Sequence, residues 1–363
     1  MGLPTDPEGC PLIFSVGNPP TEGMPTELEG SRLSTGWGLW QPGEGDSVDA
    51  WLVNPKLKLL ADTQGGVYSR GQAADCGYTP GQINDRIQDG RWERIRHGQY
   101  AEAVELDHLP AWDQQSLKHR RLVHAVMNSM SPGRVAVSHQ SALVLHRVPL
   151  WGPELAEVHV NRLDRHRGGR IAGVRHHRGK LTDVDLTVTD GLLATTVPRA
   201  LFETACTSSF EAAVVSADAV RRDHPISEVD VQRLLEATEF WPGSATARAA
   251  LGFSDPLSES VGESRFRVLV HTYGLPAPVL QAVFTDAAGF VGRVDFFFAA
   301  ERTVVEFDGL LKYGDGARET LIREKLREDR LRALGLQVVR VTWADLDHPA
   351  SLIARIRAAF ARA

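Results

Sequence analysis

The apolar positions first repeat with a helical period over residues 57–61, which we expect to form a helix. Two capping boxes follow, in which a serine or threonine and the glutamine three residues later bind each other's backbone N–H groups at a helix start. They are formed by Ser69 with Gln72 and by Thr79 with Gln82. Each therefore predicts the start of another short helix.

The next run, "RWERIRHGQYAEA", alternates between polar and apolar residues, which predicts a β-hairpin that turns at Gly98. Helix, short helix, turn, helix and hairpin is the order of a winged helix-turn-helix, whose second motif helix enters the DNA major groove. We expect base contacts from this helix and phosphate contacts from the hairpin, or wing. The candidate DNA-binding residues are Gln82, Asn84, Arg86, Gln88, Arg91, Arg94 and Arg96. Asp85 and Asp89 oppose DNA binding, and a winged helix that serves only protein contacts is the alternative.

Residues 112–250 mix helical and strand patterns, which predicts a mixed α/β middle domain. "QQSLKHRRLVHAVMNSM" and "AVSHQSALVLHRV" each fit an amphipathic helix, and "LAEVHVNR" and "IAGVRHHRG" each fit a strand. The run "VPRALFETACTSSFEAAVVSADAVRR" is expected to be helical.

The pattern of residues 255–363 predicts a third domain, which starts with a helix in "LSESVGESRFRVLVHTYG". Strands are expected at 279–284, 291–298 and 303–307, followed by a charged helix over about 319–334. A strand in "LQVVRVTW" and a final helix complete an α/β sandwich around a mixed sheet. The expected fold class is therefore α+β with several domains: a winged helix-turn-helix at 51–105, then the middle domain, then this α/β domain.

Charge is distributed unevenly, so the formal net charge of −6 does not exclude a nucleic-acid partner. Residues 1–50 contain one basic and eight acidic residues, 1 − 8 = −7, and their seven prolines and nine glycines predict disorder. A mis-assigned start codon is the alternative for this segment.

By contrast, residues 118–180 contain twelve Lys/Arg, three Asp/Glu and eight of the thirteen histidines. These histidines, such as the His139/His146 pair and "RHHRG" at 175–179, lack the spacing of a structural zinc site. We expect a basic surface that contacts phosphate, with a solvated face as the alternative.

Acidic residues within apolar strands of the last domain suggest metal chemistry. Glu306 and Asp308 alternate onto one face of their strand, and Asp295 lies on the strand before them. Paired strands would bring Asp295 beside Glu306, and Glu263 could reach the same edge from the preceding helix. Gathered carboxylates repel unless a cation compensates, and Mg²⁺ suits them because it keeps waters for hydrolysis. Solvated acids or partners of arginine are the alternative.

The runs "GESRFR", "GRVDFFF", "TVVEFDGLLKYG" and "REDRLRALGLQVVRVTW" resemble the PD-(D/E)xK superfamily, in particular the branch related to very-short-patch-repair endonucleases. The resemblance implies a restriction-endonuclease-like fold and a Mg²⁺ ion held by Asp295, Glu306 and Asp308, with Glu263 assisting. The superfamily lysine is replaced by Asp308, and Lys312 stands where relatives often have histidine. Lys312 or Lys325 would then supply the catalytic positive charge, or the site has lost catalysis.

A second resemblance covers residues 52–205 and is strongest at the start, in "LLADTQGGVYSRGQAADCGYTPGQINDRIQDGRWERIRHGQYA". This segment resembles the amino-terminal domain of AbiEi-type antitoxins from type IV toxin–antitoxin systems. The resemblance implies promoter binding through the winged helix and repression of the protein's own operon. It implies DNA as a partner, with a toxin or regulatory protein as a second class of partner.

Two functional hypotheses follow from these patterns. One is a DNA-binding protein whose last domain hydrolyses a DNA phosphodiester with Mg²⁺. The other is an AbiEi-like transcriptional regulator or antitoxin whose nuclease-like domain is inactive. No signal peptide, membrane span or small-molecule cofactor motif is apparent, and three scattered cysteines suit a reducing cytoplasm.

Overall fold

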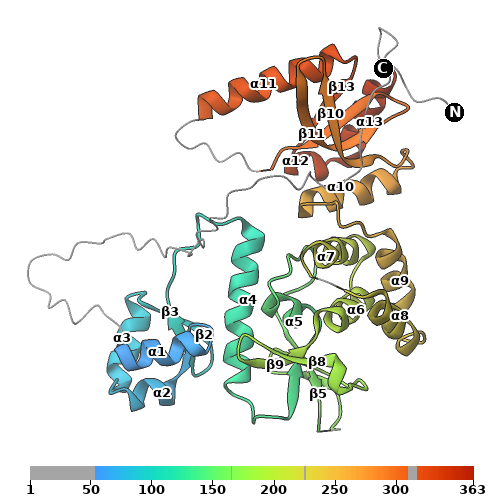
Figure 1. Ribbon diagram of the computed structural model, residues 1–363. Helices are drawn as coiled ribbons and strands as arrows, with labels where there is room; N and C mark the ends of the chain where they lie inside the picture. The colour runs from blue at the N-terminus through green and yellow to red at the C-terminus, as the bar shows by residue number, and fades with distance from the viewer. Residues whose placement is uncertain (1–53, 165, 225, 310–316) are drawn as a thin grey trace, which may run out of the picture.

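The computed structural model describes residues 54–164, 166–224, 226–309 and 317–363 (Figure 1). Within these ranges the strands form three sheets, one in each of the three predicted domains. The predicted disorder of residues 1–50 lies outside the described residues. No helix of the described chain combines the length and the apolar character that crossing a lipid bilayer requires.

The first unit has the expected order of a winged helix-turn-helix. Its elements are α1 (Pro55–Thr63), β1 (Val67–Ser69), α2 (Arg70–Asp75), α3 (Pro80–Gln88), β2 (Trp92–Arg96) and β3 (Gln99–Glu102). The antiparallel sheet has the order β1-β3-β2. Both predicted capping boxes are formed, by Ser69 with Gln72 at α2 and by Thr79 with Gln82 at α3. The sequence therefore sets the starts of both helices of the motif.

The middle unit is a six-stranded mixed sheet with the order β6-β7-β5-β4-β9-β8. Its strands are β4 (Val135–Val137), β5 (Val158–Arg162), β6 (Gly169–Ile171), β7 (Val174–His177), β8 (Leu186–Thr189) and β9 (Leu192–Thr195). Its helices are α4 (Ala111–Met127), α5 (His139–Leu145), α6 (Val197–Thr207), α7 (Phe210–Asp223), α8 (Glu228–Ala237) and α9 (Ser244–Phe253).

Two of the elements predicted for this unit are wrong in detail. "AVSHQSALVLHRV" is not one helix, because its first residues complete β4 and α5 begins only at His139, whose backbone has φ +53°. "IAGVRHHRG" forms two strands rather than one, because the chain turns at Ala172 and Gly173, both with positive φ. In both segments a residue with positive φ changes the direction of the backbone within a run that was predicted as one element.

Helix α4 joins the first two units instead of belonging to one of them. Its residue Ala125 packs in a small core with Val67 and Ala101 of the winged helix. Its residues Val123 and Val126 pack in the core of the middle unit. The predicted boundary between residues 105 and 112 therefore does not separate the packing of the two units.

The last unit is a four-stranded sheet between helices, with the order β10-β11-β12-β13. Its elements are α10 (Val261–Thr272), β10 (Val279–Asp286), β11 (Gly289–Phe298), β12 (Thr303–Phe307), α11 (Ala317–Ala333), β13 (Gln337–Val341), α12 (Trp343–Leu346) and α13 (Pro349–Phe360). Helices α10 and α13 pack on one face of the sheet, while Leu331 of α11 packs on the other. The predicted order of elements is confirmed, with α12 as an additional short helix.

The last unit is anchored to the middle unit through α7 and α10. Arg267 of α10 donates a hydrogen bond of 2.7 Å to Asp218 of α7, and both side chains are buried. Trp343 of α12 stacks on Trp112 at the start of α4, with ring centroids 4.8 Å apart. A buried charge pair has defined geometry, so it fixes how the two units meet.

Candidate functional site

The winged helix is built around Trp92, the first residue of β2. The Trp92 ring meets Tyr68 and Tyr78 edge-on, each with centroids 4.9 Å apart. Arg86 of α3 lies over the same rings, 5.2 Å from the centroid of Tyr78 and 5.7 Å from that of Trp92. This aromatic core holds α3 against the wing strands.

The prediction that Arg86 is exposed for base contacts is wrong. Arg86 lies three residues after Ile83, so the two side chains share the inward face of α3. The Arg86 side chain is 8% exposed and contributes a cation–π contact to the core. Its role in this fold is therefore structural.

The outward face of α3 presents amide side chains. Gln82, Asn84 and Gln88 are all exposed. The side-chain Oε1 of Gln82 accepts a hydrogen bond of 2.9 Å from the backbone N–H of Thr79, because Gln82 completes the capping box. Asn84 and Gln88 lie one turn apart on the same side of the helix. These two amides have the chemistry for reading an adenine edge in the major groove.

The arginines of the wing differ in how freely they can contact a DNA phosphate. Arg94 is exposed and Arg96 is half-buried. Arg91 is paired with Asp89, to which its Nε donates a hydrogen bond of 2.8 Å, and the bond lowers the pKa of the Asp89 carboxyl. Arg94 is therefore the strongest candidate for a phosphate contact among the predicted wing residues.

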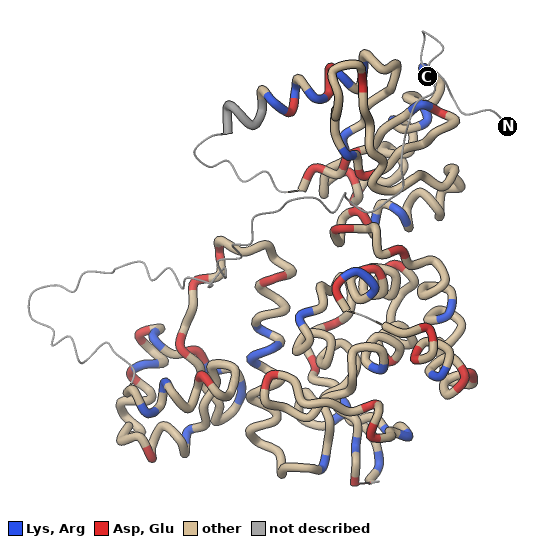
Figure 2. Tube along the Cα trace, in the orientation of Figure 1, with Lys and Arg blue, Asp and Glu red and all other residues tan. Residues whose placement is uncertain are grey.

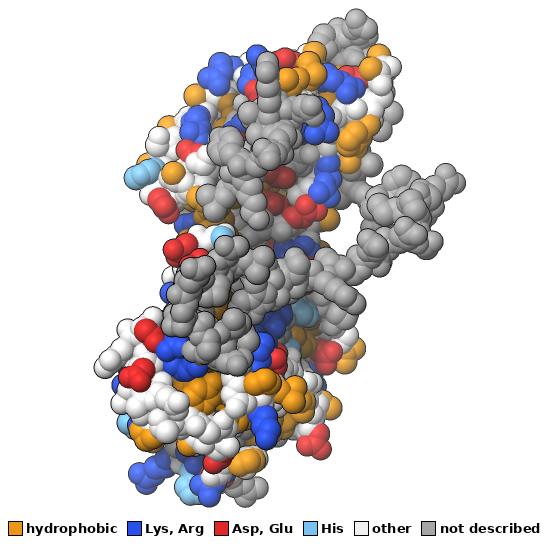
Figure 3. Space-filling view, turned by 90° about the vertical axis from the view of Figure 1, so that its left-hand side faces the viewer, with side chains coloured by type: hydrophobic (Ala, Val, Ile, Leu, Met, Phe, Trp, Pro, Cys, Tyr) orange, Lys and Arg blue, Asp and Glu red, His pale blue; other side chains and the backbone are white. Residues whose placement is uncertain are grey.

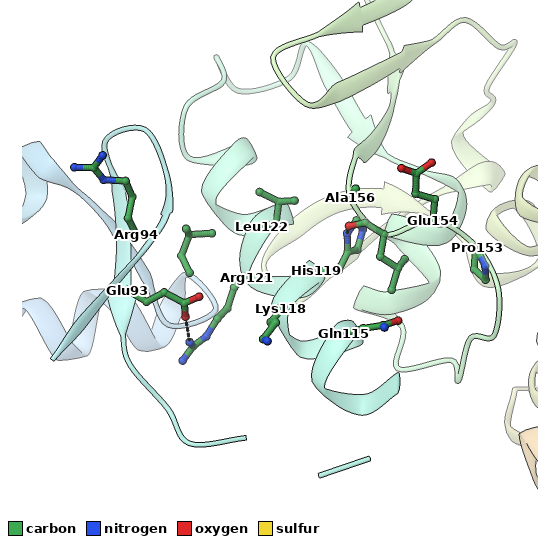
Figure 4. Close-up of a pocket in the computed structure, with 12 residues that line it drawn as sticks. Glu93, Arg94, Gln115, Lys118, His119, Arg121, Leu122, Pro153, Glu154 and Ala156 are labelled. Carbon is green, nitrogen blue, oxygen red and sulfur yellow. Dashed lines mark hydrogen bonds and ion pairs between the residues drawn. The ribbon is translucent and has the colours of Figure 1, made fainter. Parts of the chain in front are cut away.

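A cavity of about 510 Å³ separates the wing strand β2 from the start of the middle unit (Figure 4). Lys118 and Arg121 of α4 line it together with Arg94 of β2. Arg121 points toward Glu93 of β2, with 3.4 Å between their charged atoms. These α4 residues were not among the predicted DNA-binding residues, although the basic amphipathic run "LKHRRLVHA" contains them. The basic groups beside the wing therefore extend onto α4.

The predicted basic surface of the middle unit is only partly present. The side chains of His119, His124, His139 and His159 are buried. Arg170 pairs with Glu157 at 2.7 Å, which leaves less positive charge available for phosphate. Basic and acidic residues are interspersed along the described chain and over the visible face (Figures 2 and 3). Attraction of DNA therefore depends on local groups rather than on a uniform field.

Two of the predicted catalytic carboxylates lie close together between α10 and the sheet. Glu263 accepts hydrogen bonds from the Glu259 N–H at 2.9 Å and from the Ser260 hydroxyl at 2.8 Å. Asp295 of β11 accepts a hydrogen bond of 2.8 Å from the backbone N–H of Phe307. Burial raises the pKa of Glu263 to about 7, and the negative charge of Asp295 adds to the effect. Protein groups therefore already occupy lone pairs of both carboxylates.

The other two predicted metal ligands are held by arginines. Nη2 of Arg327 on α11 lies 2.6 Å from Oε1 of Glu306, and Nη1 of Arg340 lies 3.1 Å from Oδ1 of Asp308. Glu306 is buried, and burial raises the pKa of its carboxyl while Arg327 lowers it. The predicted catalytic Lys312 lies outside the described residues.

This arrangement does not fit the predicted magnesium site. Within the described ranges, one group of three possible metal ligands has its ligand atoms within 4.8 Å of one another, and that group consists of histidines, not of Asp295, Glu306 and Asp308. Arg340 also pairs with Glu324 and Glu328 of α11, so the positive charge that the acids need is supplied by the protein. Magnesium binding and catalysis by these residues therefore remain predictions.

Comparison with known proteins shows which family the first unit resembles. Two uncharacterized proteins, from two strains of Mycobacterium tuberculosis, are each 30% identical to this chain over 145 residues. The match covers 40% of this chain and 53% of each relative, so the chain spans about half the length of these curated relatives. Residues 55–103, from α1 to β3, match the family model described as "Transcriptional regulator, AbiEi antitoxin". Residues 55–103 are thus similar to the AbiEi antitoxin and transcriptional-regulator family.

Proposed function

We propose that this protein is a DNA-binding transcriptional regulator that recognises its site with α3 and the wing. The observation that carries the proposal is the pair of exposed amides, Asn84 and Gln88, on a helix that the AbiEi-type match includes. Arg94 on the adjacent wing supplies positive charge, and Lys118 of α4 lines a cavity together with it. Amides read base edges and arginines hold phosphates, so the winged helix carries the side-chain types that both parts of specific binding require.

The proposed role of the last unit is to support regulation without metal-dependent hydrolysis. Glu306 and Asp308 are paired with Arg327 and Arg340, and Asp295 accepts a hydrogen bond from the backbone N–H of Phe307. The buried Arg267–Asp218 pair ties this unit to the middle unit. A unit with these features is suited to present a fixed surface to DNA or to a toxin or regulatory protein.

The DNA proposal is tested by fluorescence anisotropy with DNA from upstream of the protein's own gene and with a scrambled duplex. We expect the double variant Asn84→Ala/Gln88→Ala to lose about 10-fold or more of its preference for the upstream DNA, since each good base contact contributes about 1–3 kcal/mol. Arg94→Ala should weaken binding to both duplexes and lower the slope of log K against log salt by about 1.

Arg248→Ala provides the charge-matched control, because Arg248 is an exposed arginine on α9, away from the winged helix. It should leave both affinities unchanged. If the double variant keeps the full preference for upstream DNA, α3 does not read the site and the proposal is wrong.

We expect no Mg²⁺-dependent cleavage of plasmid or mismatched duplex, because arginines take the place of a metal ion beside Glu306 and Asp308. Agarose gels of DNA incubated with Mg²⁺, Mn²⁺ or EDTA should look alike for the natural protein and for Asp295→Ala. Cleavage that requires metal and disappears in Asp295→Ala would instead establish the nuclease hypothesis.

A further inference from the structure

Three histidines from separate parts of the middle unit meet in its interior. His139 is the first residue of α5, His159 lies on β5 and His177 is the last residue of β7. One ring nitrogen from each lies within 4.8 Å of the other two. The proposed DNA recognition uses none of them.

Two of the three rings face each other through a nitrogen, and the third is stacked on one of them. Nε2 of His177 lies 3.1 Å from Nδ1 of His159, and the ring of His139 stacks on that of His177 with centroids 3.8 Å apart. Imidazole nitrogens grouped in this way are donors that divalent transition-metal ions such as zinc accept.

The second ring nitrogens of His139 and His159 both contact polar groups. Nδ1 of His139 lies 3.0 Å from the Ser138 hydroxyl and 3.5 Å from a carboxylate oxygen of Glu203. Glu203 is itself fixed by Arg199, whose Nε donates a hydrogen bond of 2.8 Å. Metal-binding histidines commonly donate their second N–H to a carboxylate or another acceptor, which orients the ring.

Gln140 gives an independent indication at His159. Its amide nitrogen lies 3.0 Å from Nε2 of His159, while its buried Oε1 has no hydrogen-bond partner among the described residues. Oxygen and nitrogen of a glutamine amide can exchange places, at the expense here of the hydrogen bond to the Glu154 carbonyl. Oε1 would then accept the Nε2 proton of His159, and the Nδ1 lone pair would face His177.

We propose that His139, His159 and His177 bind one divalent transition-metal ion, for which we name zinc. Zinc–nitrogen bonds of 2.0–2.1 Å place two tetrahedral ligand nitrogens roughly 3.4 Å apart, close to the distance between His159 and His177. His139 completes the set through one ring nitrogen, which lies within 4.8 Å of the ligand nitrogens of His159 and His177. A bound ion joins α5 to β5 and β7, and a cavity of about 450 Å³ lined by His159 and Gln140 gives it a route of entry.

The test is metal binding by the untagged full-length protein after treatment with EDTA and dialysis. We expect one equivalent of Zn²⁺ by mass spectrometry, a higher melting temperature with Zn²⁺, and visible absorption from bound Co²⁺ typical of a four-coordinate site. His177→Gln should weaken Zn²⁺ binding by about 100-fold or more. His176→Ala is the matched control, because it removes the neighbouring histidine of the same strand and should bind Zn²⁺ normally.

Two results overturn the proposal. One is a natural protein that shows neither the rise in melting temperature nor the Co²⁺ absorption. The other is a folded His177→Gln variant that binds Zn²⁺ as tightly as the natural protein. The measurements on the natural protein decide the question even if His177→Gln does not fold, and DNA affinity does not enter either readout.

Discussion

Replacing Gly243 by alanine is expected to lower the free energy of unfolding by more than about 3 kcal/mol. Gly243 precedes α9 with φ +82°, a conformation that alanine adopts only with strain. A Cβ atom at this position would lie 1.9 Å from the backbone oxygen of Cys206, at the end of α6. A backbone atom cannot move aside as a flexible side chain does, so α9 would be displaced from α6.

Gly252→Ala is the matched control for this prediction. Gly252 lies inside the same helix, and a Cβ atom there meets no atom within 4 Å. Alanine should therefore raise the stability by about 0.5–1 kcal/mol, as it does in an exposed helix interior. Urea unfolding followed by circular dichroism measures both changes. Equal stability of the Gly243→Ala and natural proteins would show that α9 does not approach Cys206 so closely.

Signals that depend on residues close in sequence predicted the structure well. Ser69 with Gln72 and Thr79 with Gln82 fix helix starts through hydrogen bonds that span three residues, and both are formed. The alternation around Glu306 also holds, because Phe307 packs in the core on one face while Glu306 meets Arg327 on the other. Such features need no knowledge of the distant chain.

Features that depend on tertiary contacts were missed or misread. Arg86 was predicted to contact DNA because it lies on the second helix of the motif, but its side chain packs over Trp92 and Tyr78 in the core. His139 and His177 are separated by 38 positions, 177 − 139, so no local spacing predicted their cluster. The positive partner of Glu306 is Arg327 of α11, which follows β12 in the chain and packs back against the sheet. Sequence pattern gives the faces of elements, but not which charged groups meet across them.

Replacing Arg327 by alanine should destabilise the last unit by about 2–3 kcal/mol. Removing one partner of a buried ion pair commonly costs about 3–5 kcal/mol, and the value is reduced here because Arg327 is 23% exposed. Among the residues that the structure describes, the charged partner left to Glu306 would be Arg340, at 3.7 Å. Thermal and urea unfolding measure the loss. Arg332→Ala is the control, since Arg332 pairs with Glu328 on the outer side of α11 and its loss should have little effect.

The same variant separates a structural ion pair from a metal site that has been blocked. Without Arg327 the pKa of Glu306 rises further above its value in the unfolded chain, so the folded state binds a proton that the unfolded state does not. The stability that Arg327→Ala loses relative to the natural protein is therefore largest at pH 8, and it shrinks as the pH falls and Glu306 becomes protonated.

If the carboxylates are purely structural, millimolar Mg²⁺ changes the melting temperatures of the variant and the natural protein equally. A selective rise for Arg327→Ala would mean that Asp295, Glu306 and Asp308 still gather around a cation once the arginine is gone, which would return the nuclease hypothesis to first place.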